Sequence, residues 1–133
     1  MKTEFTLTRG GLIEASTLRD IIHRYEKIRT QVFPAEAEGV RYVADRIVLA
    51  IADYEKQSAS DYYDDPEPFV LGLTTGQTPL ALYRELVRRY KAGEVSFAHV
   101  AVCSLDEFYP IGADEQQSRN RFIREEFLSQ VDI

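Results

Sequence analysis

A polar turn between two apolar segments is the first place where this sequence could carry out chemistry. It follows the apolar run 69–73, precedes Pro79 and consists of Thr74, Thr75, Gly76, Gln77 and Thr78. We expect Gly76 to adopt a positive φ and Thr78 to cap a helix that begins at Pro79. The free N–H groups of such a first turn, with the positive end of the helix dipole, can hold a phosphate. The alternative is an ordinary strand-to-helix turn with a threonine cap.

A pair of carboxylates is the second such place. Asp106 and Glu107 directly follow the apolar run 100–105. Held next to a sugar phosphate, a carboxylate can remove a proton from the carbon beside a carbonyl and return it to the adjacent carbon, which is an aldose–ketose isomerisation. An acidic pair is more often a helix cap or part of a solvated loop. Its position at the end of a buried strand, beside a candidate anion site, favours a functional role here.

Two strands and the helix between them must position both groups. The apolar runs 69–73 and 100–105 have the density of apolar residues expected of strands buried on both faces. A helix from Pro79 to about residue 92 separates them, and Gly93 ends it. A strand–helix–strand unit of this kind is a right-handed crossover with a parallel pair of strands. Both carboxyl ends then lie at the same edge of the sheet, where ligands bind in open α/β folds.

Helical spacing of apolar residues predicts three further helices. The first of these helices follows an irregular segment, 1–16. It begins near Ser16 or Thr17 and extends to about residue 28. Another covers 35 to about 56, with an apolar stripe that we expect to pack against the sheet, and a third begins near Ser118. Segment 57–68 has the composition of an exposed loop. The basic residues of the helix after Pro79 are expected to face mostly solvent: Arg84, Arg88, Arg89 and Lys91.

Composition limits the classes of partner. The chain has 133 residues, 44% of them hydrophobic, which suffices for one domain with a core. Its formal net charge of -6 argues against nucleic acid or an anionic membrane as a partner. The single cysteine, Cys103, is expected to be a buried core thiol, as in a reducing compartment. No apolar stretch reaches the roughly 20 residues of a membrane helix, so we expect a cytoplasmic protein.

An ordered set of motifs carries a resemblance to a known family. From about Ala35 onward, over some three quarters of its length, the chain resembles the N-terminal half of the glucosamine-6-phosphate deaminase (or isomerase) family. The family shares its fold with 6-phosphogluconolactonases and ribose-5-phosphate isomerases. In order, the motifs are Glu38-Gly-Val-Arg-Tyr-Val-Ala44, Leu71-Gly-Leu-Thr-Thr-Gly-Gln-Thr-Pro79, Ser96-Phe-Ala-His-Val100, Leu105-Asp-Glu-Phe108, and Gln117-Ser118 with Phe122.

The resemblance implies a fold, a reaction and roles for individual residues. The fold is a Rossmann-like α/β fold with a parallel sheet and three layers, and the reaction converts glucosamine 6-phosphate and water into fructose 6-phosphate and ammonia. Neither a metal nor a cofactor is implied, and the complete protein is expected to be a homo-oligomer. Asp106 matches the aspartate that moves the proton between carbons 1 and 2, and Glu107 is assigned a supporting role. The loop that holds the sugar phosphate matches Thr75, Gly76, Gln77 and Thr78.

Two positions depart from the family pattern and keep alternatives open. At the position of Gln77 family members usually have Gly or Ser, and at the position of Phe108 they usually have Tyr. The glutamine is compatible with 6-phosphogluconolactonases, although their pattern favours Asp-Glu-Arg at 106–108. A second alternative is a domain that binds a sugar phosphate and regulates without catalysis.

The resemblance also divides the chain and implies a longer protein. Residues 1–34 are expected to be an N-terminal extension with one helix, and 35–133 the N-terminal part of a sugar-phosphate isomerase/deaminase domain. The family's ring-opening histidine and its acidic partners lie beyond the point that aligns with Ile133. Neither His23 nor His99 matches that histidine. His23 is expected on a solvated helix surface and His99 at the strand end opposite the crevice. This chain alone is therefore expected to be inactive.

Overall fold

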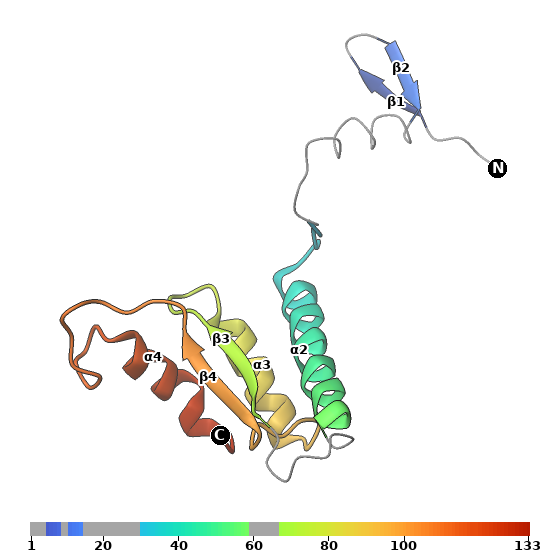
Figure 1. Cartoon of the computed structure of the whole chain (residues 1–133). Coiled ribbons are helices and arrows are strands. Elements are labelled where there is room, and N and C mark those ends of the chain that lie inside the picture. The colour runs from blue at the N-terminus through green and yellow to red at the C-terminus, as the bar shows by residue number, and fades with distance from the viewer. Residues whose placement is uncertain (1–4, 9–10, 15–29, 59–66) are drawn as a thin grey trace. The chain divides into compact units, whose positions relative to one another are not determined.

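The computed structural model describes residues 5–8, 11–14, 30–58 and 67–133, and the chain divides into two units, Met1–Val32 and Phe33–Ile133 (Figure 1). In the first unit, strands β1 (Phe5–Thr8) and β2 (Gly11–Glu14) form an antiparallel pair. The expectation of an irregular segment over 1–16 was therefore wrong at these positions, where β-branched and aromatic residues favour strands. The helix expected from Thr17, with His23, lies outside the described residues.

The second unit contains the elements expected around the candidate site and, in addition, a short 3-10 helix that was not expected. They are α2 (Glu36–Ser58), β3 (Phe69–Leu73), α3 (Leu80–Lys91), β4 (Val100–Ser104), α4 (Arg119–Glu126) and a short 3-10 helix, η1 (Leu128–Gln130). Strands β3 and β4 pair in parallel, with Phe69 opposite Val100 and Leu73 opposite Ser104. The predicted parallel pair is confirmed, and both strands end at the same edge of the sheet.

One face of the strand pair forms the core. Tyr83 from α3 and Phe127 after α4 lie against each other with ring centroids 5.5 Å apart, and Phe97 meets Phe127 at 5.3 Å. Alternate strand residues point into this cluster, and Leu73 and Val100 are both buried. Helices α3 and α4 therefore cover the same face of the pair.

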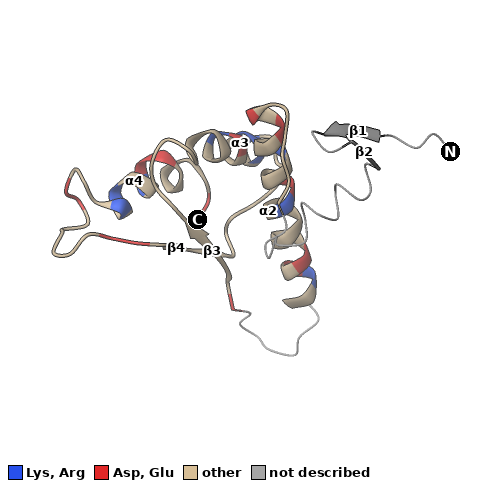
Figure 2. Cartoon of the chain, turned by 90° about the horizontal axis from the view of Figure 1, so that it is seen from above, with Lys and Arg blue, Asp and Glu red and all other residues tan. Residues whose placement is uncertain are grey.

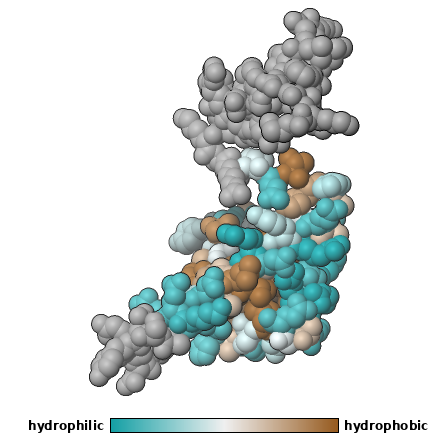
Figure 3. Space-filling view, turned by 90° about the vertical axis from the view of Figure 1, so that its right-hand side faces the viewer, coloured by the Kyte–Doolittle hydropathy of each residue, from teal (hydrophilic) through white to brown (hydrophobic). Residues whose placement is uncertain are grey.

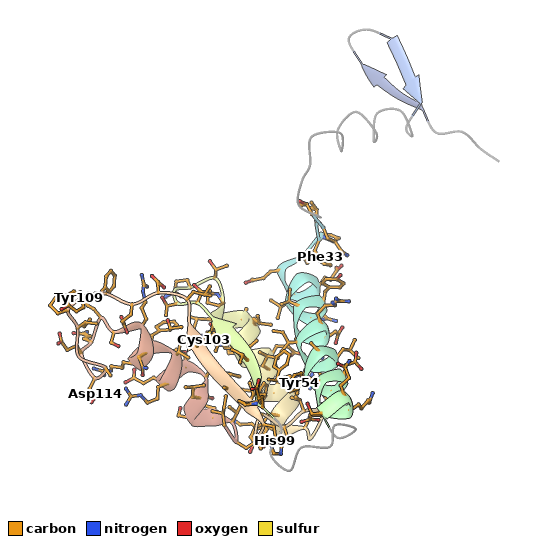
Figure 4. All side chains as sticks on the ribbon, viewed as in Figure 1. Phe33, Tyr54, His99, Cys103, Tyr109 and Asp114 are labelled. Atoms are coloured by element: carbon orange, nitrogen blue, oxygen red, sulfur yellow. The ribbon has the colours of Figure 1, made fainter. Side chains whose placement is uncertain are left out.

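The opposite face of the pair is exposed in the described structure. Val70 is 64% exposed and Leu105, just after β4, is 70% exposed. Cys103 lies on this face and is exposed, so the expectation of a buried core thiol was wrong (Figure 4). An apolar run shows that a segment is a strand, but it does not show which of its faces the neighbouring elements will cover.

Helix α2 packs mainly against α3, whereas we had expected its apolar stripe to lie on the sheet. Its contact with the sheet is near its end, where Tyr54 meets Phe69 edge-on at 5.6 Å. Arg89 on α3 is only 8% exposed and pairs with Asp45 of α2 at 2.6 Å and with Glu85 at 2.9 Å. The expectation that Arg89 faces solvent was therefore wrong, because α2 covers that side of α3.

The face of the described part seen in Figure 3 is mostly hydrophilic, with smaller areas of apolar side chains. Leu49 on α2 and Tyr109 after β4 are among the exposed apolar residues. Among the helices that the structure describes, none is long and apolar enough to cross a membrane.

Candidate functional site

The turn between β3 and α3 has the backbone expected of a phosphate loop. Gly76 has a φ of +104°, which a residue with a Cβ rarely adopts. The hydroxyl of the buried Tyr83 donates a hydrogen bond to the carbonyl of Thr74 and so fixes the start of the turn from within the core. Burial raises the pKa of Tyr83, partly offset by this hydrogen bond. A residue of α3 thus holds the start of the turn from the side of the core.

The helix that follows begins one residue later than expected. Pro79 is the N-cap residue, with helical backbone angles and no side-chain capping bond, and α3 starts at Leu80. The prediction that Thr78 caps this helix was wrong, because the N–H of Leu80 already bonds to the carbonyl of Gln77 at 3.3 Å. Within the described part of the chain, the N–H groups of Gly76, Gln77 and Thr78 make no hydrogen bond. These three donors remain available to an anion.

Asp106 lies where β4 ends, at the same sheet edge as the turn. Its side chain is 59% exposed, and its own carbonyl accepts a hydrogen bond from the Ser104 hydroxyl at 2.7 Å. Acidic residues follow β4 and basic residues lie on α4 (Figure 2). The carboxylate of Asp106 is therefore accessible at the strand end, as a proton-transferring group must be.

Glu107 has a different environment from Asp106. Its carboxylate accepts hydrogen bonds from the backbone N–H groups of Arg119, Asn120 and Phe108 at 3.0–3.1 Å and from the hydroxyl of the buried Ser118 at 2.9 Å. These bonds, that from Arg119 foremost, lower the pKa of Glu107 from 4.5 to about 2. Glu107 thus caps the first turn of α4 and ties it to the end of β4.

Arg119, the first residue of α4, joins the two sequence-predicted groups. Its Nη1 donates a hydrogen bond to the Thr75 hydroxyl, and its Nη2 lies 3.4 Å from Oδ2 of Asp106. The guanidinium carbon lies 4.7 Å from the centroid of the Phe108 ring. Sequence reasoning missed Arg119, although a cation at the positive end of a helix is unfavourable and thus signals another purpose.

Three other residues considered in the sequence analysis are not hydrogen-bonded to Asp106 or Arg119. Gln77 and Thr78 are exposed, and no hydrogen bond joins either of them to Asp106 or Arg119. His99 lies at the opposite end of β4, as expected, where its carbonyl accepts the N–H of Phe69 at 2.9 Å (Figure 4). Among the described residues, no three His, Cys, Asp or Glu side chains are grouped so that they could hold a metal ion.

A cavity of about 450 Å³ lies away from these residues. Its lining includes Ile51 of α2, Tyr90 of α3 and Val95, which precedes β4 at the end opposite Asp106. Two of its polar groups, Glu55 and Glu94, are acidic and would repel a phosphate. The turn, an open surface feature, is therefore a better candidate anion site than this cavity.

Comparison with solved structures defines the class of fold. One structural neighbour is a monomeric glucosamine-6-phosphate deaminase, with a TM-score of 0.63 at 23% identity over 79% of this chain and 39% of that one. Another, a devB protein, gives a TM-score of 0.56 at 18% identity over 77% of this chain and 38% of that one. These likenesses confirm a partial Rossmann-like α/β fold.

Comparison with curated sequences finds similar proteins. Glucosamine-6-phosphate deaminases match from Tolumonas auensis (42% identity, 71% of this chain, 32% of the relative) and Vibrio parahaemolyticus (50% identity, 73% of this chain, 34% of the relative). No family model matches the chain. The chain spans about a third of the length of these relatives. It is homologous to part of a glucosamine-6-phosphate deaminase, which confirms the resemblance seen in its sequence.

Proposed function

We propose that the complete protein containing this chain converts glucosamine 6-phosphate and water into fructose 6-phosphate and ammonia, with Asp106 as the proton carrier. The observation that carries this proposal is the position of Asp106 at the same sheet edge as the turn 75–78, with Arg119 in contact with both Asp106 and Thr75. The homology to deaminases over this part of the chain supports it.

The chemistry follows from the position of each group. The N–H groups of Gly76, Gln77 and Thr78, with the Thr75 hydroxyl, would bind the phosphate and fix the sugar in the crevice. The carboxylate of Asp106 would take the proton from carbon 2 and return it to carbon 1. The resulting imine at carbon 2 then reacts with water and releases ammonia. This route uses neither a metal ion nor a redox cofactor.

We assign Glu107 a positioning role in this mechanism. Its carboxylate is occupied by three backbone N–H groups and one hydroxyl, and its pKa of about 2 makes it a poor proton acceptor at neutral pH. By capping α4 it holds Arg119 beside Asp106.

Substitution of Asp106 tests the proposal. In the full-length protein, Asp106→Asn should lower kcat for ammonia release from glucosamine 6-phosphate by on the order of 10²–10⁴-fold, because the amide cannot accept the proton. Asp114→Asn is the matched control, since Asp114 is an exposed loop carboxylate paired with Arg124. Undiminished ammonia release by a folded Asp106→Asn protein would refute the assignment.

The same assay separates the two alternative functions. Hydrolysis of 6-phosphogluconolactone without deamination would indicate a lactonase, and saturable sugar-phosphate binding without turnover would indicate a regulatory domain. Neither alternative is favoured by the comparisons.

We further propose boundaries and a setting for the complete protein. Residues 1–34 would form an extension and 35–133 part of the catalytic domain. The protein would act in the cytoplasm as a homo-oligomer, and its partner would be a small sugar phosphate. The oligomer rests on the family resemblance, while one structural neighbour is described as monomeric. Light scattering on the full-length protein measures its mass and decides between the two states.

A further inference from the structure

We propose that Arg119 binds the phosphate of the substrate at the turn 75–78 and releases Asp106 when it does so. This inference rests on the proposed function, because it concerns the substrate of that same site. Arg119 lies beside Thr75 of the turn and Asp106 of the strand end, and both contacts come from a single guanidinium. The positions predicted for phosphate and proton transfer are therefore within reach of one cation.

The guanidinium has donor capacity that the protein does not use. Its contact with Asp106, at 3.4 Å, is longer than the roughly 2.8 Å of a charge-assisted hydrogen bond. Its Nε is shielded and makes no hydrogen bond, which sets it apart from every other buried side-chain nitrogen and oxygen in the described residues. Nε and Nη2 form one edge of the guanidinium, the edge that binds two oxygens of a phosphate or carboxylate.

The surroundings hold Arg119 in place and leave it accessible. The Phe108 ring lies below the guanidinium, and the Glu107 carboxylate fixes the backbone N–H of Arg119 at 3.0 Å. The Arg119 side chain is 30% exposed, so a ligand at the turn can reach it. A side chain whose backbone is fixed and whose guanidinium is partly exposed can move its charge over a short distance.

Charge decides which partner Arg119 prefers. A phosphate near neutral pH carries up to two negative charges, and the carboxylate of Asp106 carries one. A phosphate placed on the N–H groups of Gly76 and Gln77 would therefore draw the guanidinium away from the loosely held carboxylate. Only a phosphorylated sugar would then leave Asp106 unpaired and ready to accept a proton, so binding of the phosphate is coupled to proton transfer.

The competing interpretation is that Arg119 only ties α4 to the turn. In that case its loss would lower the melting temperature and leave phosphate affinity unchanged. If Arg119 instead binds the phosphate, its loss should weaken phosphate affinity. Measuring phosphate affinity therefore distinguishes the two interpretations.

The test uses Arg119→Met and Arg119→Lys in the full-length protein, with Arg121→Met as the matched control. Arg121 lies on the same helix and pairs with Glu125 at 2.7 Å. For Arg119→Met, we expect KM for glucosamine 6-phosphate and the inhibition constant of inorganic phosphate both to rise roughly ten- to a hundredfold. For Arg119→Lys, both constants should lie between those of Arg119→Met and the wild type, because lysine keeps the positive charge but lacks the two-donor edge of the guanidinium. Arg121→Met should match the wild type in both constants.

Two results would overturn the inference. One is an inhibition constant for phosphate that stays at the wild-type value in both Arg119 variants. The other is a lowered melting temperature as the sole effect. Titration calorimetry with inorganic phosphate keeps this test separate from the deaminase proposal. If the wild-type protein releases no ammonia but binds phosphate in an Arg119-dependent way, the inference stands and the deaminase proposal fails. If it releases ammonia and the Arg119 variants bind phosphate normally, only the inference fails.

Discussion

At the scale of single residues, the two adjacent carboxylates of the candidate site have different partners. Glu107 accepts three hydrogen bonds from the start of α4 and a fourth from the N–H of Phe108, whereas Asp106 is exposed and has one long contact with a cation. A carboxylate that is fully bonded is stabilised as an anion and is a weak base. The different roles proposed for Asp106 and Glu107 therefore follow from the positions of the hydrogen-bond donors at the start of α4.

Glu107 should make stability depend on acid pH. Its pKa is about 2 in the folded protein, compared with an ordinary value of 4.5. A lowered folded pKa contributes stability above the unfolded pKa, and this contribution is lost as pH falls from about 4.5 through 2. Glu107→Gln should melt a few degrees below the wild type at pH 7, and the difference should narrow toward pH 3.

Thermal unfolding followed by circular dichroism at pH 7, 5 and 3 measures this effect. Glu125→Gln is the matched control, because Glu125 forms an exposed ion pair with Arg121 that adds little stability. An equal melting temperature for Glu107→Gln and the wild type at pH 7 would contradict the capping role.

At the scale of elements, the turn depends on α3 as much as on its own sequence. The Tyr83 hydroxyl reaches from the core to the carbonyl of Thr74 and holds the residue next to Thr75. The donors of the turn are useful to a phosphate only if they are fixed before it arrives, because ordering them on binding costs free energy.

Tyr83→Phe should therefore weaken phosphate binding without disrupting the fold. The ring keeps its contact with Phe127, while the loss of one hydrogen bond should cost about 1 kcal/mol of stability. The inhibition constant of inorganic phosphate should rise several-fold. Tyr90→Phe on the same helix serves as the control and should leave this constant unchanged. If the two variants bind phosphate equally well, Tyr83 does not position the turn.

Local patterns predicted the elements of the second unit, because each pattern lies within a single segment. The apolar runs gave β3 and β4, the helical spacing gave α2, α3 and α4, and Gly93 marked the end of α3 with a φ of +72°. The sequence could not show that Arg119 reaches Thr75, 44 residues away, since that contact depends on how α4 packs. Arg89 was misplaced for a similar reason, because its burial depends on α2.

At the scale of the second unit as a whole, one buried arginine joins two helices. Arg89 binds Asp45 of α2 and Glu85 of its own helix, and its Nη2 also donates to the carbonyl of Arg41 at 3.4 Å. The hydrogen bonds and charge of Arg88 and Arg89 lower the pKa of Glu85 from 4.5 to about 2. Because α2 packs mainly on α3, these bonds lie at the main contact of α2.

Arg89→Met should lower the free energy of unfolding by about 1–3 kcal/mol, because Asp45 and the Arg41 carbonyl lose a charged donor. Arg84→Met is the control, since Arg84 is exposed on the same helix. Urea denaturation at neutral pH compares the two variants, and an Arg89→Met protein as stable as Arg84→Met would show that the network adds nothing.

The exposed face of β3 and β4 has a practical use that follows from Cys103. The sequence contains one cysteine, and it lies on the side of the sheet away from α3 and α4. Within this chain, a maleimide dye would therefore attach only at Cys103. The rate of labelling at Cys103 in the full-length protein, followed by mass spectrometry of the peptide that contains it, would report how much polypeptide covers that side of the sheet. This sulfhydryl can therefore show how the rest of the protein is arranged around these two strands.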